Sequence, residues 1–248
     1  SRIQGSDLEG EPPGMTETIA IEMVSDLVCP WCWLGLRRLK TAVDMVPEVT
    51  TEVYFRPYQL DPTVPEDGMQ YKVYMRAKFG PEAPEGSEHD ESKNRWKMMR
   101  QALEDYGAAE GIPFDFDNIP KRPNTTNAHR LVHWAQGQGL GLEAKEAIFH
   151  AYFAEHRDIG DKGVLTDIAE QIGLDRSIVS DLLAGDGDKD TIANEANLFM
   201  QMGVRGVPCF IGNRSIAVQG AETPEKIAKL IRATAAQKPE ERGRAAPV

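Results

Sequence analysis

The stretch Val28-Cys29-Pro30-Trp31-Cys32-Trp33 (VCPWCW) lies between an apolar run and a helical pattern. Before it, residues 18–25 (TIAIEMVS) are rich in Ile and Val and predict a buried strand. Pro30 is typical of the first position of a helix, because its missing N–H would have no partner there. Apolar residues then recur at steps of three and four to Val46, which predicts a helix. Alternation over residues 50–58 predicts a second strand, so the three elements form a parallel strand–helix–strand unit.

The rest of the chain changes its pattern twice. Residues 62–202 carry almost entirely helical patterns, and Gly203 follows them as a C-terminal cap. Two short apolar strands come next, with Gly212-Asn213 suited to a tight hairpin turn between them. A closing helix begins at Thr223 as N-cap and Pro224 as first residue.

Composition narrows the class of protein. The chain has 248 residues and a formal net charge of −11, which disfavours nucleic-acid and anionic-membrane partners. It contains no apolar run approaching the roughly 18 residues that span a bilayer. Residues 1–14 are polar and rich in Gly and Pro, and we interpret them as a cloning remnant or a disordered leader. Because residues 15–24 lack the features of a signal peptide, we expect a cytoplasmic protein, where structural disulfides are rare.

The two cysteines of the opening stretch suit disulfide exchange. Cys29 precedes the helix-opening proline, so its sulfur is expected to meet free backbone N–H groups and the positive end of the helix dipole. Both favour a thiolate over a thiol. Cys32 lies one turn further in, on the apolar face, and is expected to be less exposed. This asymmetry favours Cys29 as attacking thiol and Cys32 as resolving thiol.

Two other interpretations of the C-x-x-C pair remain open. A structural zinc site needs two more ligands, and the sequence offers Cys209 and the distant pair His129/His133. Alternatively, both cysteines are small core residues. The strand–helix–strand context favours a redox dithiol over both.

Six segments complete the pattern: SDLVCPWCWLG, FRPYQLDP, NTTNAHRL, AYFAEHRDIGD, GVRGVP and AVQGAE. Together they resemble the DsbA-like thioredoxin-fold oxidoreductases, and within them the FrnE-like branch. The relatives include kappa-class glutathione transferases and 2-hydroxychromene-2-carboxylate isomerases. The resemblance implies an α/β thioredoxin fold (residues 15–62 and 203–236) with a large all-helical insertion (63–202) and a flexible tail (237–248).

The resemblance also implies roles for individual residues. Cys29 is the expected nucleophile, Cys32 the resolving thiol, and Pro208 a cis-proline facing them. Val207 is expected to offer its backbone to an extended substrate. The other residues expected to bind substrate are Pro30, Trp31, Tyr58, Gln59, Asn124 and His129, the last of which also suits a structural pairing.

Three positions depart from the family pattern. The isomerase relatives place a serine at Cys29, so a cysteine there favours redox chemistry. Met23 stands where thioredoxin-like proteins commonly bury a carboxylate; Glu22 should face away, and Asp26 is either an auxiliary base or a solvated turn residue. Cys209 follows Pro208 and is either a small buried hydrophobe or a third thiol near Cys29.

The sequence therefore predicts a thiol–disulfide oxidoreductase that acts through Cys29 and Cys32. A glutathione-dependent transferase or isomerase is the alternative, and a metal-binding or partner-binding module is a third hypothesis. The enzyme would need no bound cofactor or metal, with glutathione as a candidate thiol co-substrate. Its partners would be protein or small-molecule disulfides and thiols, with no nucleic acid or membrane.

Overall fold

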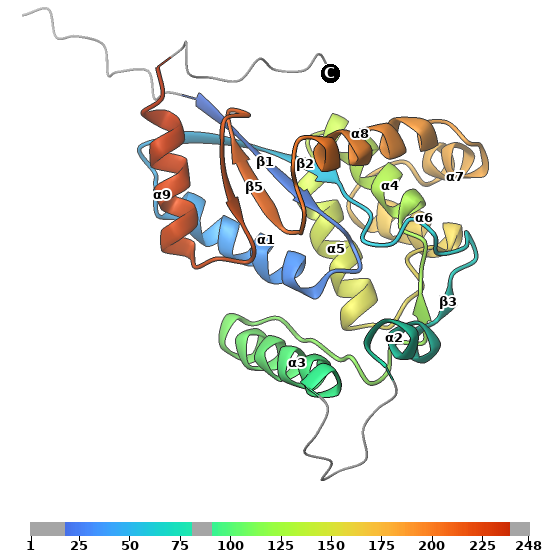
Figure 1. Cartoon of the computed structure of the whole chain (residues 1–248). Coiled ribbons are helices and arrows are strands. Elements are labelled where there is room, and N and C mark those ends of the chain that lie inside the picture. The colour runs from blue at the N-terminus through green and yellow to red at the C-terminus, as the bar shows by residue number, and fades with distance from the viewer. Residues whose placement is uncertain (1–17, 81–90, 239–248) are drawn as a thin grey trace, which may run out of the picture.

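The computed structural model describes residues 18–80 and 91–238, and for residues 91–94 it describes the backbone alone. A four-stranded sheet forms its centre, in the order β2-β1-β5-β6 (Figure 1). β1 and β2 are parallel, and β5 is antiparallel to both β1 and β6, so the predicted strand–helix–strand unit and terminal hairpin are confirmed. The strands are β1 (Thr18–Ser25), β2 (Thr50–Pro57), β5 (Cys209–Gly212) and β6 (Ile216–Gln219).

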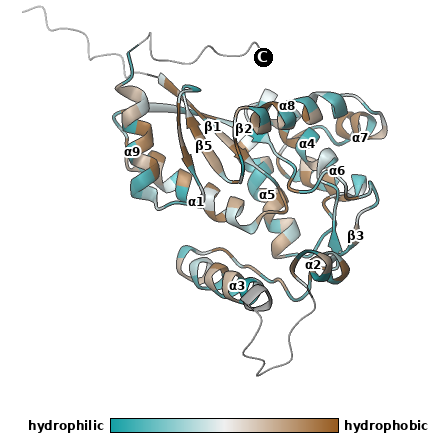
Figure 2. Ribbon diagram, viewed as in Figure 1, coloured by the Kyte–Doolittle hydropathy of each residue, from teal (hydrophilic) through white to brown (hydrophobic). Residues whose placement is uncertain are grey.

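Alternating side chains of β1 and β5 enter two different cores. Ile21, Met23 and Phe210 join the larger core with α1 (Pro30–Asp44) and α9 (Pro224–Ala235), which pack against each other. Val24 and Cys209 join a smaller cluster with residues of α8 (Lys189–Gln201). Figure 2 shows hydrophobic residues concentrated along β1 and β5, while the helices around them carry both hydrophobic and hydrophilic residues.

Helices fill the chain between β2 and β5, as predicted. Apart from α8, which contributes to the smaller cluster, these helices contribute side chains to the same large core as α1 and α9. A two-stranded ribbon of β3 (Met69–Gln70) and β4 (Lys121–Arg122) was not predicted from the sequence. The helices of this region are α2 (Tyr71–Phe79), α3 (Glu91–Glu110), α4 (Thr126–Gly137), α5 (Gly141–Phe153), α6 (Lys162–Gln171), α7 (Arg176–Ala184) and α8.

Local signals explain several helix ends. Thr223 accepts a hydrogen bond from the backbone N–H of Lys226, and Gly203 adopts a φ of 97° just after α8, both as predicted. Two predicted bounds were wrong. α1 ends at Asp44 rather than Val46, and the hairpin turn consists of residues 213–215, because Gly212 still pairs with Ile216.

Three further predictions concern the ends and boundaries of the chain. The leader at residues 1–14 lies outside the described residues, as does the tail from residue 239. The boundaries at residues 62 and 203 stay predictions. Of the helices in the described ranges, none combines the length and apolarity that crossing a bilayer requires.

Candidate active site

Cys29 occupies the junction between β1 and α1. It is the N-cap of α1, with Pro30 as the first helical residue, and the backbone N–H of Cys32 donates to its carbonyl at 3.0 Å. Its sulfur makes no capping hydrogen bond to the helix, contrary to the prediction, and lies 3.8 Å from the carbonyl oxygen of Val207. The Val207–Pro208 peptide bond is cis, as the resemblance implied. The loop before β5 therefore faces the first turn of α1.

Cys32 lies in the first turn of α1 and is more deeply buried than Cys29. Its exposed fraction is 0% against 5% for Cys29, in the predicted order, and both are free thiols. Burial raises the pKa of the Cys32 thiol, and its hydrogen bond to Cys29 and the charge there raise that pKa further. The Cys32 thiol is therefore protonated at neutral pH.

Lys145 is a buried cation near both cysteines that the sequence analysis did not identify. It lies on α5, is 1% exposed, and its Nζ is 5.5 Å from the ring centroids of Phe55 and Phe149. Burial lowers the pKa of Lys145 to about 8, while the charges of Cys32 and Asp26 oppose that shift. Its charge in turn favours the thiolate of Cys32. Lys145 is thus an ionisable group beside Cys32, where Met23 supplies none.

Asp26 is a buried acceptor rather than the solvated turn residue considered above. It is 1% exposed, its Oδ1 accepts from the Leu27 amide at 2.8 Å, and its Oδ2 accepts from the Leu60 amide at 2.9 Å. The Nε2 of His129 lies 3.2 Å from the same Oδ1 and 3.0 Å from the carbonyl oxygen of Tyr58. Because both partners are acceptors, Nε2 carries the proton. The structural pairing expected for His129 is therefore present.

The pKa of Asp26 is raised by burial and lowered by hydrogen bonds and nearby positive charges. Burial would raise its pKa, but the hydrogen bond and charge of His129, the charge of Arg122 and the Leu60 amide together hold the pKa below its ordinary value. Asp26 is thus ionised at neutral pH. Glu22 lies on the other face of β1, as predicted, and forms ion pairs at 2.8 Å with Arg56 and Arg214.

A cavity of about 240 Å³ opens beside Cys29. Of the residues predicted to bind substrate, Pro30, Trp31 and Val207 line it. Trp31 is half-buried and makes an edge-on contact with Tyr106, with 6.3 Å between ring centroids. The far wall comes from α2, α3, β4 and the loop between α3 and β4. It consists mainly of the side chains of Tyr71, Tyr74, Lys78, Trp96, Phe116 and Arg122.

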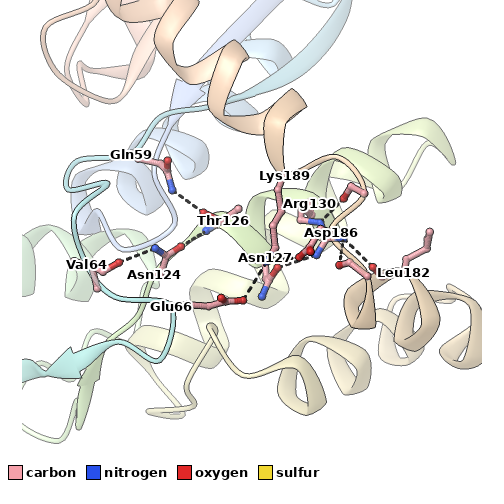
Figure 3. A network of polar contacts seen from close by, with 12 residues as sticks. Gln59, Val64, Glu66, Asn124, Thr126, Asn127, Arg130, Leu182, Asp186 and Lys189 are labelled. Atoms are coloured by element: carbon pink, nitrogen blue, oxygen red, sulfur yellow. Dashed lines mark hydrogen bonds and ion pairs between the residues drawn. The ribbon is translucent and has the colours of Figure 1, made fainter.

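The other residues predicted to bind substrate lie outside that lining. Tyr58 belongs to the smaller core, and His129 is occupied by Asp26. Figure 3 shows Gln59 and Asn124 in a polar network that ties the segment after β2 to α4. Gln59 Nε2 donates to Thr126 Oγ1 at 3.0 Å, and Asn124 Nδ2 donates to the Val64 carbonyl at 2.7 Å. The structure therefore gives these residues partners that hold the fold together.

Cys209 is separated from the pair by the sheet. It is 5% exposed and packs with Val24 and Phe199, whereas Cys29 and Cys32 belong to the larger core. Burial raises the pKa of its thiol to about 11. The structure thus favours the buried-hydrophobe interpretation of Cys209. Within the described ranges, no group of three or more His, Cys, Asp and Glu side chains is arranged to hold a metal.

Arg122 and Lys145 were missed for different reasons. Lys145 takes a position on the apolar stripe that continues to Ile148, Phe149 and Tyr152, and a lysine inside such a stripe is a readable signal of burial. Arg122 belongs to the two-residue strand β4, which is too short to show a periodic pattern in the sequence. Nothing local therefore predicts that its side chain reaches the cavity.

Comparisons with known proteins agree with this geometry. Residues 20–232 match the model of the DSBA-like thioredoxin domain family. The uncharacterised protein YwbO of Bacillus subtilis is 28% identical over 158 residues, which is 64% of this chain and 68% of that protein. The crystal structure of a probable DsbA oxidoreductase from Streptomyces coelicolor has a TM-score of 0.77 and 26% identity, covering 93% of this chain and 94% of that one.

A more distant structure shares the fold. It is a 2-hydroxychromene-2-carboxylate isomerase with a TM-score of 0.62 and 15% identity, covering 86% of this chain and 93% of that one. The predicted thioredoxin fold with a helical insertion is confirmed by these matches.

Proposed function

The chain belongs to the DSBA-like thioredoxin domain family, and we propose that it is a thiol–disulfide oxidoreductase that acts through Cys29 and Cys32. The observation that carries the proposal is the arrangement of the two thiols. Cys29 borders a cavity and lies opposite a cis-proline loop, while Cys32 is fully buried and hydrogen-bonded to it. In this proposal the Cys29 sulfur meets the substrate, and the Cys32 sulfur displaces it.

The proposed reaction conserves atoms and electrons. The Cys29 thiolate attacks one sulfur of a substrate disulfide and the substrate S–S bond breaks. One half of the substrate leaves as a thiolate, which takes up a proton to become a thiol. Cys32 then loses its proton and attacks the Cys29 sulfur, which releases the second substrate thiol. The enzyme dithiol is oxidised to a Cys29–Cys32 disulfide, and the substrate disulfide is reduced to two thiols. The reverse sequence oxidises a dithiol substrate.

Groups near the two cysteines support the second step, in which Cys32 attacks the mixed disulfide at Cys29. Because the pKa of Cys32 is raised, its deprotonation limits the release of substrate unless a positive charge or a proton acceptor is near. Lys145 supplies the charge from α5, and a hydrogen bond from the backbone of Asp26 also lowers the pKa of Cys32. Neither residue is exposed, so solvent does not screen them.

The proposal extends to the co-substrate and the compartment. No bound cofactor is needed for exchange between thiols, and glutathione is the thiol co-substrate that we propose would return the Cys29–Cys32 disulfide to its dithiol form. We place the reaction in the cytoplasm, where reducing systems keep such thiols available.

Single-cysteine variants test the proposal. With an aromatic disulfide such as dithiobis(nitrobenzoate), the wild type should release two thiols in succession and end with a Cys29–Cys32 disulfide. Cys32→Ser should release one thiol and retain a mixed disulfide at Cys29, whereas Cys29→Ser should give neither product at this site. Cys209→Ala serves as the matched control and should behave as wild type. Full activity of Cys29→Ser, or no mixed disulfide in Cys32→Ser, would refute the proposal.

A further inference from the structure

Arg122 is a buried cation with unused hydrogen-bonding capacity. It is 6% exposed, and its Nη1 donates a long hydrogen bond of 3.5 Å to the carbonyl oxygen of Val28. Within the described residues its Nε has no hydrogen-bond partner, and no carboxylate lies within ion-pair distance. Burying a guanidinium without an anion is costly, so an unpaired group of this kind in a native fold calls for an explanation.

The nearest acids do not supply the missing anion. Both oxygens of Asp26 already accept hydrogen bonds, from the Leu27 and Leu60 amides and from His129. Asp61 binds the backbone N–H and hydroxyl of Thr63 at 3.0 and 2.6 Å. Both carboxylates interact with Arg122 through space, but their oxygens point at other donors. The unused N–H donors of Arg122 are therefore available to a ligand.

Arg122 lines the same cavity as Cys29. Its guanidinium carbon is 4.6 Å from the centroid of the Tyr74 ring, and the Nζ of Lys78 is 5.7 Å from that centroid. Two cations thus share one aromatic ring at the cavity wall, while Trp96 and Phe116 supply apolar surface. This combination suits a ligand that has both a negative charge and a flat apolar body.

The size and cover of the cavity point to a small ligand. Its volume of about 240 Å³ lies just below the roughly 300–1,000 Å³ of ordinary small-molecule pockets. Figure 1 shows α3 beneath α1 and α2 beneath the end of α5, and side chains of both helices line the cavity beside Cys29, which is 5% exposed. A cavity of this volume suits a ring-sized molecule better than the surface of a large folded protein.

Resting on the exchange chemistry proposed above, we propose that this cavity binds a low-molecular-mass disulfide or thiol with a ring-sized apolar group that carries a carboxylate. Arg122 receives the carboxylate, Lys78 adds positive charge at the exposed side, and the aromatic wall holds the ring. The sulfur of a bound disulfide then lies toward Cys29, whose attack breaks the substrate S–S bond and releases the second half as a thiolate that takes up a proton. In the reverse reaction a bound thiol attacks the Cys29 sulfur and breaks the Cys29–Cys32 disulfide. Arg122 is the residue that selects the substrate.

Two matched probes test this assignment. Dithiobis(nitrobenzoate) carries a carboxylate on each ring, and bis(nitrophenyl) disulfide has the same nitro-substituted rings without it. The rate constant of mixed-disulfide formation at Cys29 is measured with each. Arg122→Gln should slow the carboxylated probe about tenfold, the value of one charge-assisted hydrogen bond, and the neutral probe by less than about twofold.

The control variants separate the role of Arg122 from general effects. Arg176→Gln removes an exposed charge on α7 and should change neither rate constant, while Arg122→Lys should restore part of the preference. Lys78 is exposed, so Lys78→Gln is expected to fold and to lower selectively the rate of the carboxylated probe, by about threefold. An equal loss for both probes in Arg122→Gln, or unchanged rates in both Arg122→Gln and Lys78→Gln, would overturn the assignment.

A binding assay distinguishes this inference from the proposed function and from a peptide ligand. Benzoate should protect Cys29 of the wild type from alkylation, and benzamide should not, whether or not the protein turns over. Protection without formation of a Cys29–Cys32 disulfide would support the site and refute the exchange reaction. Protection by an apolar peptide bearing one carboxylate, with none by benzoate, would assign the cavity to peptides and overturn the inference.

Discussion

His129 Nε2 lies 3.2 Å from Asp26 Oδ1, so an imidazole of α4 holds the carboxylate that precedes the two cysteines. The contact joins the helical insertion to the junction between β1 and α1. Because both side chains are almost fully buried, it is shielded from solvent and salt. The first prediction follows from this pair.

Asp26→Asn should lower the free energy of unfolding at pH 7 by about 2–3 kcal/mol, because an amide replaces an acceptor of charge-assisted hydrogen bonds. Since the folded pKa of Asp26 is lowered, its contribution is complete above its unfolded pKa of about 3.9 and is lost as the pH falls through the lower folded value. Urea unfolding at pH 7 and pH 3 measures both effects. Asp181→Asn, at an exposed position of α7, should stay within about 0.5 kcal/mol of wild type. An equal loss in both variants would contradict the account.

Lys145→Met should slow the second thiol release from an aromatic disulfide about tenfold at pH 7, because the Cys32 thiolate loses its nearby cation. The first release should stay within about twofold of wild type. The difference should shrink above pH 8, where Lys145 of the wild type loses its charge. Stopped-flow absorbance resolves the two steps, and Lys40→Met, on the partly exposed part of α1, is the control. A defect in the first step alone would be inconsistent with this role.

The same substitution should raise stability at pH 7 by about 1–3 kcal/mol, because it removes a buried charge. The folded pKa of Lys145, about 8, lies below its unfolded value of about 10.4, so the unfolded chain binds more protons between these values. The stability of the wild type should therefore rise with pH across this window relative to Lys145→Met. Urea midpoints at pH 7 and pH 10 provide the test, and parallel pH dependences would rule it out.

Gly35→Ala should destabilise the protein by about 1–3 kcal/mol and slow both steps of exchange. A Cβ at residue 35 would lie 2.8 Å from the Pro208 Cγ and 3.2 Å from the Phe210 Cζ, so α1 would have to move away from the cis-proline loop. Gly137→Ala is the matched control, since a Cβ there meets nothing within 4 Å. It should leave exchange unchanged and add up to about 1 kcal/mol of helix stability. Similar effects of both substitutions on exchange would contradict this packing argument.

Cys209 should resist alkylation by iodoacetamide in the folded protein at pH 8, because burial raises the pKa of its thiol to about 11. Mass spectrometry of labelled peptides measures the rate at each cysteine, and the urea-unfolded chain supplies the reference rate for Cys209. Fast labelling of folded Cys209 would show that this thiol reaches solvent and would reopen its redox role.

The sheet and α1 were predictable because their signals are local. The apolar run of β1, Pro30 at the start of α1 and Thr223 at the start of α9 each act within a few residues, and the structure confirms them. The end of α1 was predicted two residues too late, because the apolar pattern continues to Val46 beyond the last helical hydrogen bonds. Periodicity marks which face is buried more reliably than where a helix stops.

The site was predictable in its cysteines and less so in its surroundings. The spacing of Cys29 and Cys32 fixes their relation along one helix, whereas the pairing of Asp26 with His129 joins residues 103 positions apart. Arg122 enters the cavity from a two-residue strand that has no pattern of its own. Tyr58 and Asn124 lie in segments that resemble the family, yet a resemblance in sequence does not distinguish substrate contacts from contacts that hold the fold.

A redox titration with site-by-site mapping tests the central claim most directly. The wild type is equilibrated with reduced and oxidised glutathione at graded ratios, free thiols are alkylated, and each cysteine is quantified by mass spectrometry. The account predicts that Cys29 and Cys32 lose their free thiols together along one two-electron curve, while Cys209 remains a thiol throughout. If Cys29 and Cys32 stay reduced at the most oxidising ratio, or if either pairs with Cys209, the account is contradicted.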